Sequence, residues 1–331
     1  MELENSQSFI VRITAELRDE FKRLDQLLVD QLEDMSRSTL KSLYEKDYVF
    51  WHKDSSYQGK LELKKMPPVG SIIEIKVPPP APCRAEAQNI PLEILYEDEH
   101  LVFVVKPAGL VTHPAPGHPD QTLVNAILHH CPDLKGVGDE RRPGIVHRLD
   151  KGTSGVMVVA KTQKCHEGLV NIFSTHQLER KYLCLCLAQD LPSSGKLEST
   201  IGRHPTFRKK MAANVQGKQA ITHYKKLEQF EKISYMEMTL ETGRTHQIRV
   251  HLTSLLNAPI LMDEIYGKPR AHLKALPEKV RFLLSDYPYP LLHAHLLALK
   301  HPITGEELRF ESDPPEIFKE SVKLLRQESS R

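Results

Sequence analysis

Residues Gly144–Thr162 read Gly-Ile-Val-His-Arg-Leu-Asp-Lys-Gly-Thr-Ser-Gly-Val-Met-Val-Val-Ala-Lys-Thr. The apolar run Val156–Ala160 has the length and the β-branched content of a buried strand. Asp150 stands shortly before this run, with Arg148 and Lys151 beside it and two glycines close behind. The pattern predicts a tight loop at the mouth of a buried strand, which presents a single carboxylate between cations.

Two roles are open to Asp150 at this point. Cations within about 4–6 Å would lower the pKa of its carboxyl group by roughly 1–3 units. A carboxylate that stays ionised is a poor general acid, but it suits the role of a nucleophile. An aspartate that caps a turn or pairs with an arginine explains the stretch equally well.

The composition narrows the class of protein. With 331 residues the chain is long enough for two domains. No run approaches the roughly 20 apolar residues of a membrane span, and the acidic, polar N-terminus does not resemble a signal peptide. The five cysteines form no C-x-x-C pair, which favours a reducing cytoplasm over a disulfide or zinc framework. P-loop and G-x-G-x-x-G patterns are absent, so we expect no nucleotide cofactor and no metal.

Strands outnumber helices and do not alternate with them regularly, which predicts an α+β fold rather than a doubly wound sheet. The proline-rich stretch Pro78–Pro82 predicts a stiff linker between two domains. We expect four segments: an N-terminal extension at 1–15, a small helix-hairpin domain at 16–78, a linker at 79–89 and a large domain at 90–331.

In the small domain, leucines and a phenylalanine at three- and four-residue steps predict a first helix over residues 16–32. A second helix is expected over 34–44, with Ser36 as its cap, followed by strands over 48–51 and 71–77. The elements expected in the large domain are two strands within 94–106, helices over 122–130 and 168–174, strands over 180–187 and 233–241, and a helix over 245–256 whose Ile248, Leu252 and Leu255 face inward.

The segment Arg203–Lys226 contains seven basic residues and no acidic one. A charge run of this kind is commonly a solvated face, and it is also the pattern of a surface that binds a polyanion. The basic residues are Arg203, Arg208, Lys209, Lys210, Lys218, Lys225 and Lys226.

The segment His147-Arg-Leu-Asp-Lys-Gly-Thr-Ser-Gly155 resembles the signature of the RluA/RluD family of large-ribosomal-subunit pseudouridine synthases. Further segments resemble other motifs of that family in order and spacing: Lys106–Gly109 with His113-Pro114, Arg180–Tyr182, Thr242–His251, Asp263 with Tyr266-Gly267, Leu292–Ala294 and His301-Pro302. One departure is Met262, where the family usually has a glycine before the aspartate. The resemblance covers about residues 90–312 and implies a catalytic domain with a large mixed, mainly antiparallel β-sheet.

A second resemblance covers about residues 16–78. The segments Arg23-Leu-Asp-Gln-Leu-Leu, Ser36-Arg-Ser and Val69-Gly-Ser-Ile-Ile-Glu-Ile are similar to those of the S4 RNA-binding module. The module usually carries a Val-Asn-Gly-Lys hairpin, where this chain has Val49-Phe-Trp-His-Lys-Asp54. An S4 module in front of the catalytic domain is the arrangement of the RluD-like branch.

The resemblance implies three catalytic residues. Asp150 is expected to be the nucleophile, Tyr182 to stack on the uracil, and Arg249 to pair with Asp150. Arg148 is a candidate to fill the space that a flipped base leaves, or to form another salt bridge. The residues expected to contact RNA are Arg148, Arg37, Lys41, Lys106, His113, Arg203, Lys209, Lys210 and Arg244.

The implied reaction isomerises specific uridines of RNA to pseudouridine, without a redox step, so no cofactor is expected. We expect a cytoplasmic monomer whose partner is 23S ribosomal RNA or the assembling large ribosomal subunit. Two alternatives stay open: a transfer RNA pseudouridine synthase, and a non-catalytic RNA-binding or ribosome-assembly protein with the same fold.

Overall fold

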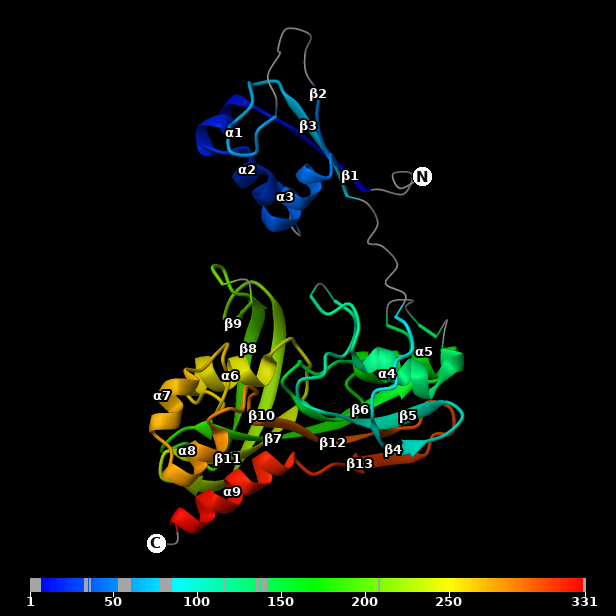
Figure 1. Ribbon diagram of the computed structural model, residues 1–331, viewed down its shortest axis with the longest axis vertical. Coiled ribbons are helices and arrows are strands. Elements are labelled where there is room, and N and C mark those ends of the chain that lie inside the picture. Colours follow the sequence, from blue (N-terminus) through cyan, green and yellow to red (C-terminus); the bar gives the residue numbers. More distant parts are fainter. Residues whose placement is uncertain are drawn as a thin grey trace. The chain divides into compact units, whose positions relative to one another are not determined.

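The computed structural model describes residues 7–32, 35, 37–52, 61–77, 85–115, 117–134, 137–138, 142–207 and 209–329. The chain divides into two compact units, residues 1–82 and 83–331, which are described separately below (Figure 1). Ser36, Arg208 and the predicted linker prolines lie outside the described residues.

The first unit packs three helices against a three-stranded antiparallel sheet of order β1-β3-β2. Its core joins Leu24, Leu28 and Leu40 of the helices to Ile73 and Ile75 of the central strand. The elements are β1 (Gln7–Arg12), α1 (Ala15–Glu20), α2 (Leu24–Gln31), α3 (Arg37–Glu45), β2 (Val49–His52) and β3 (Ile72–Val77).

Three sequence predictions for these regions are wrong. Residues 7–12 belong to the sheet as β1, because Phe9 and Val11 alternate toward the core; they are not a loose extension. The single helix expected over 16–32 is two helices, since Phe21 takes an extended conformation and its backbone N–H bonds back to Leu17. Residues 85–89, expected in the linker, lie on the second unit, where the Gln88 N–H donates to the carbonyl oxygen of Asn125 at 3.0 Å.

The second unit is built on a ten-stranded sheet of order β4-β5-β6-β12-β7-β11-β10-β8-β9, with β13 paired to β12 (Figure 1). Among the described strands only β6 and β12 pair in parallel, so the expected α+β fold with a mainly antiparallel mixed sheet is confirmed. The strands are β4 (Glu93–Glu97), β5 (Leu101–Lys106), β6 (Ser154–Ala160), β7 (Leu178–Leu187), β8 (Ser194–Arg203), β9 (Met211–Ala213), β10 (Lys218–Phe230), β11 (Ile233–Leu240), β12 (Leu292–Lys300) and β13 (Glu307–Glu311).

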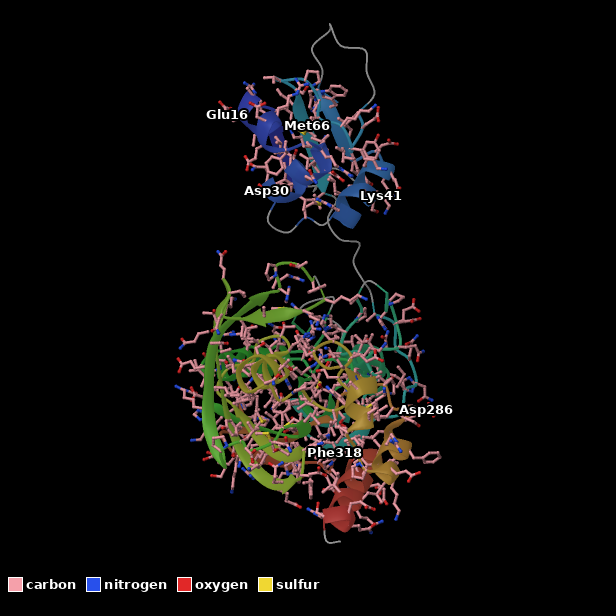
Figure 2. All side chains as sticks on the ribbon, turned by 90° about the vertical axis from the view of Figure 1, so that its left-hand side faces the viewer. Glu16, Asp30, Lys41, Met66, Asp286 and Phe318 are labelled. Carbon is pink, nitrogen blue, oxygen red and sulfur yellow. The ribbon has the colours of Figure 1, made fainter. Side chains whose placement is uncertain are left out.

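Helices cover both faces of this sheet. Val102 and Val104 of β5 pack with α4, whereas the alternate residues Leu101 and Phe103 pack with α5, as the two-residue period of a strand requires. In the other half, α6 packs on one face of β7 and β11, and α8 and α9 pack on the opposite face. Phe318 of α9 is buried in this contact (Figure 2). The helices are α4 (Leu123–His130), α5 (Gln163–Ser174), α6 (Gln247–Leu256), α7 (Pro269–Lys274), α8 (Glu278–Leu284) and α9 (Glu316–Ser329), with a short 3₁₀ turn at Pro132–Leu134.

The basic segment Arg203–Lys226 contains β-structure that its composition did not indicate. It runs from the end of β8 through β9 into β10. Burial along β8 alternates because only one side of the strand meets the core. The polar side chains on the other side interrupt the apolar run by which a strand is recognised in the sequence. No helix within the described ranges has the length and apolar character needed to cross a membrane.

Candidate active site

The Asp150 loop is anchored on both sides by backbone contacts. The Thr112 hydroxyl donates to the Leu149 carbonyl oxygen at 2.9 Å, and the Gly109 N–H donates to the Lys151 carbonyl oxygen at 2.7 Å. Within the loop, the Thr153 N–H donates to the Asp150 carbonyl oxygen at 3.0 Å. The loop that contains Gly109 and Thr112 therefore fixes the Asp150 backbone before β6 begins.

Lys106 is fully buried, which corrects its prediction as an RNA contact. Its ammonium donates to the carbonyl oxygens of Pro107 at 3.0 Å and Leu110 at 2.9 Å, and lies 3.5 Å from that of Lys151. Burial lowers the pKa of Lys106 to about 7, although the negative charge of Asp150 acts in the opposite direction. Lys106 therefore supports the Asp150 loop from inside.

Gly155 and His147 fix the start of β6. Gly155 has φ +125°, and an added Cβ would lie 2.2 Å from the Ala294 carbonyl oxygen of β12, so only glycine allows this strand contact. His147 Nε2 accepts the Val158 N–H at 3.1 Å, and its ring stacks on Phe173 with centroids 4.5 Å apart. Burial, reinforced by the charge of Arg180, lowers the pKa of His147 to about 3, so the imidazole is neutral.

The Asp150 carboxylate pairs with a distant arginine. Arg249 of α6 donates through Nη1 to Asp150 Oδ2 at 3.1 Å, whereas the neighbouring Lys151 contacts His118 at 2.9 Å. Within the described residues, the side chains that reach Asp150 at ion-pair distance are Arg249 and, at 3.7 Å, His246. The structure thus shows the Arg249–Asp150 pair that the family resemblance implied, whereas Arg148 and Lys151, the sequence neighbours of Asp150, form neither of these contacts.

A second carboxylate holds Arg249. Its Nε and Nη2 donate to the two oxygens of buried Asp263 at 2.7 and 2.8 Å. Asp263 Oδ1 also accepts the N–H groups of Ile265 and Tyr266, at 2.9 and 3.0 Å. Although burial opposes ionisation, the hydrogen bonds and charge of Arg249 lower the pKa of Asp263. This two-pronged contact fixes the guanidinium plane and aims Nη1 at Asp150.

Met262 stands before Asp263, where the family motif usually has a glycine, and its backbone conformation shows how the chain accommodates the change. Met262 has φ 64°, in the left-handed region that favours glycine. Its side chain is buried in the apolar cluster beneath β7 and β11. The methionine therefore keeps the glycine-like backbone that carries Asp263 and adds apolar burial.

His246, which contacts Tyr266, also lies near Asp150. The Met211 N–H donates to the Tyr266 hydroxyl oxygen at 2.7 Å, and this hydroxyl lies 2.7 Å from His246 Nδ1. The tyrosine proton is thus available for Nδ1, which places the remaining His246 proton on Nε2, facing Asp150. Burial and the charge of Arg249 lower the pKa of His246, partly offset by Asp150.

Tyr182 lies half-buried on β7, opposite Ala294 of β12. It lines the same cavity as Asp150. Burial raises the pKa of Tyr182, and the negative charge of Asp150 adds to the effect while Arg180 opposes it. The phenol is therefore protonated at neutral pH and presents an aromatic ring in the cavity.

Asp150, Tyr182, His246 and Arg249 line a cavity of about 480 Å³. Asp150 is the single carboxylate among the described lining residues, so the cavity suits an electron-rich or anionic ligand. The structure brings together the predicted residues Asp150, Tyr182, Arg249, Arg148, His113 and Arg244. The sequence pattern did not indicate the roles of Asp263 and His246, nor the place of Arg180 in the cavity wall.

The other predicted RNA contacts lie elsewhere. Arg203 and Lys209 are exposed at the hairpin between β8 and β9. The Lys210 ammonium lies 5.6 Å from the ring centroid of exposed Phe207. Arg37 and Lys41 are exposed on α3 of the first unit, where Lys41 pairs with Glu45 at 3.4 Å.

One group of potential metal ligands occurs in the described part of the chain. Glu97, His130 and Cys131 offer atoms within 4.8 Å of one another. The Lys161 ammonium, however, lies 2.6 Å from the Glu97 carboxylate and already neutralises it. The group is therefore an ion-pair cluster, and it does not line the Asp150 cavity.

Comparison with known proteins identifies the family. The RNA pseudouridylate synthase family model matches residues 100–254. An uncharacterised RNA pseudouridine synthase of Synechocystis is 41% identical over 308 residues, which cover 92% of this chain and 89% of the relative. Ribosomal large subunit pseudouridine synthase D of Zymomonas mobilis is 40% identical over 309 residues, which cover 92% of this chain and 93% of the relative.

A solved structure agrees with these relatives. Human RNA pseudouridylate synthase domain containing 4 has a TM-score of 0.52 and 28% sequence identity, and the match covers 71% of this chain and 93% of the human chain. With relatives about 40% identical over nearly its whole length, this chain belongs to the RNA pseudouridine synthase family and is an isomerase that acts on RNA.

Proposed function

We propose that this enzyme converts specific uridines of 23S ribosomal RNA to pseudouridine, with Asp150 as the nucleophile. The observation that carries the mechanism is the Asp150 carboxylate, held 3.1 Å from Arg249 as the single acid among the described residues of the cavity wall. The substrate class rests on relatives named ribosomal large subunit pseudouridine synthase D, such as the one from Zymomonas mobilis.

The reaction breaks the N1–C1′ glycosidic bond, rotates the uracil and joins its C5 to C1′. The C5 proton is released and N1 gains a proton, so atoms balance without a redox partner. Asp150 acts as the nucleophile on the nucleoside, and the guanidinium of Arg249 orients its carboxylate. Neither step requires a cofactor.

Tyr182 and Arg148 act on the base. The uridine must leave its stack, at a cost of a few kcal/mol. The protonated Tyr182 ring lines the cavity and stacks on the uracil, as aromatic side chains do with extruded bases. Exposed Arg148 occupies the space that the base leaves in the RNA.

The remaining contacts with RNA are electrostatic. Arg203, Lys209 and Lys210 of the β8–β9 hairpin bind phosphates next to the cavity, with His113 and Arg244 on its wall. The first unit serves as an S4-like RNA-binding domain through Arg37 and Lys41 of α3. The enzyme works as a monomer in the cytoplasm, on 23S ribosomal RNA or the assembling large subunit.

The test compares pseudouridine maps of ribosomal and transfer RNA from cells with and without the gene. We expect defined 23S positions to lose pseudouridine in the deletion strain and to regain it when the gene is restored. Loss confined to transfer RNA would contradict the substrate assignment. Unchanged maps, together with no pseudouridine formed by the purified protein on 23S RNA, would contradict the proposed activity.

A further inference from the structure

Arg180 of β7 is a buried cation without an acidic partner in the described parts of the chain. Its side chain is part of the cavity wall, and the residue is 9% exposed. Nη2 donates to the Glu241 carbonyl oxygen at 3.1 Å, and Nε has no hydrogen-bond acceptor among the described residues. A buried guanidinium without an anionic partner destabilises the folded protein, unless a ligand supplies the anion.

The backbone beside Arg180 is shaped to admit the guanidinium. A Cβ added to Gly243 would lie 2.7 Å from Arg180 Nη1. Gly243 also lines the cavity, so the missing side chain leaves Nη1 room at the cavity wall. This glycine lies in the turn between β11 and α6, where a larger residue would displace the guanidinium.

Two more basic side chains converge on this end of the cavity. Arg244 follows Gly243, and its Nε donates to the Gln219 carbonyl oxygen at 3.0 Å, which fixes the side chain. His176 follows α5 in a left-handed conformation with φ 58°. Burial, and then the charges of Arg180 and Arg244, lower the pKa of His176, as expected where cations crowd together.

We propose that Arg180, Arg244 and His176 form a phosphate subsite, which binds a phosphodiester adjacent to the reacting uridine. The subsite deepens the proposed function and rests on RNA being the substrate. A guanidinium suits a phosphate because its parallel N–H groups match two phosphate oxygens. The phosphate satisfies Arg180 Nε and supplies the absent counter-charge.

The position of the subsite relative to Tyr182 agrees with one nucleotide. Arg180 and Tyr182 are two residues apart on β7, so both side chains point to the same face of the strand and line the same cavity. The two residues therefore lie about 7 Å apart along the strand. A ribose can bridge that span from a uracil on Tyr182 to its neighbouring phosphate. Binding of this phosphate would therefore set the register of the RNA in the cavity.

The test is a double-mutant cycle between protein and RNA. The probe is the shortest ribosomal RNA hairpin that the wild-type enzyme modifies, with the phosphodiester on either side of the target uridine replaced, one at a time, by a neutral methylphosphonate. In the wild type one replacement should weaken binding by about 10- to 100-fold, the worth of a charged hydrogen bond. In Arg180→Met the same replacement should change affinity less than about 2-fold, whereas Arg180→Lys should restore part of the dependence.

Controls separate the subsite from folding. Arg281→Met removes an exposed arginine of α8 that does not line the cavity, and it should leave the methylphosphonate effect at the wild-type value. If Arg180→Met does not fold, as judged by circular dichroism, the cycle is run with Arg244→Gln, which changes a partly exposed side chain. A methylphosphonate effect of equal size in wild type and variants, or none in the wild type, would overturn the subsite.

The subsite and the proposed function fail differently. If the wild type isomerises uridine normally but Arg180→Met keeps the full methylphosphonate effect, the subsite is wrong and the function stands. If the wild type forms no pseudouridine in any hairpin, the proposed function is wrong. The subsite is then tested by ³¹P line broadening of inorganic phosphate, which the wild type and Arg281→Met should cause and Arg180→Met should not; equal broadening in all three would overturn it.

Discussion

Replacing Asp263 with asparagine tests whether the Arg249 clamp is needed to hold Asp150. The two side chains are 1% and 7% exposed, so water cannot replace the lost charge. Asparagine keeps the shape but turns an amide toward the guanidinium, which breaks one of the two bonds at 2.7 and 2.8 Å. Breaking a buried pair of this kind costs about 3–5 kcal/mol, and we expect that loss in the unfolding free energy of the second unit.

Activity should fall as well. Without the clamp, Arg249 no longer holds its Nη1 at 3.1 Å from Asp150. The loss of one charged hydrogen bond, about 1.5–3 kcal/mol, corresponds to about a 10- to 100-fold fall in kcat/KM. Release of tritium from RNA labelled at uridine C5 measures this rate, because C5 loses its hydrogen in the reaction.

Asp286→Asn is the matched control, since Asp286 is exposed at the surface (Figure 2). It should change stability by less than about 0.5 kcal/mol and leave the rate of tritium release unchanged. If Asp263→Asn behaves like this control in urea unfolding and in tritium release, Asp263 does not hold Arg249, and the account of the clamp is wrong.

Three further substitutions, one of them paired with a control, test other contacts. Gly155→Ala places a Cβ 2.2 Å from the Ala294 carbonyl oxygen, so urea unfolding should show a loss of more than about 3 kcal/mol. Gly117→Ala, whose Cβ meets nothing within 4 Å at φ +88°, should lose only about 1 kcal/mol; equal losses would contradict the steric argument. Lys106→Met removes a group whose pKa falls from 10.5 to about 7 on folding. Between these values the unfolded chain keeps the proton that the folded chain releases, so the stability of the wild type relative to this variant should rise with pH by about 5 kcal/mol; a difference that does not vary with pH would refute the burial argument. Lys209→Gln should reduce the slope of log affinity against log salt for RNA by about 0.7–0.9, measured by fluorescence anisotropy, and an unchanged slope would mean that Lys209 contacts no phosphate.

The sequence was most informative where the relevant interactions are local. The apolar run before Ala160 predicts β6 because every residue of that strand is buried. The loop before it was expected because glycines favour tight turns, and it presents the half-buried carboxylate of Asp150 to the cavity. Helix α6 was likewise expected, since the period of its apolar residues is short and regular.

Interactions between distant segments could not be read in the same way. Asp150 pairs with Arg249 of another element, a partner that the family resemblance implied but that the charges beside Asp150 in the sequence did not indicate. Lys106 was expected at the surface, since lysine is seldom fully buried, and only the fold places three carbonyl oxygens around its ammonium. Strand β8 was missed because its solvent-facing side chains hide a half-buried pattern.

The break between α1 and α2 in the first unit was also not predictable from the sequence. Its first helix was expected to be continuous, because the apolar period passes without interruption through Phe21. The structure ends α1 there, and the same apolar residues still reach one core. Periodicity records which side chains face inward, but it does not record whether the backbone between them stays helical.

The most direct test of the central claim is Asp150→Asn. The substitution removes the charge and the nucleophilic oxygen, but it keeps the size of the side chain beside Arg249. The measurement is pseudouridine formation in 23S ribosomal RNA by the purified variant, together with its RNA affinity by fluorescence anisotropy. We expect no pseudouridine from the variant at any position that the wild type modifies, with RNA affinity within about 3-fold of the wild type. Pseudouridine formed at the wild-type rate, with RNA binding intact, would contradict the assignment of Asp150 as the nucleophile.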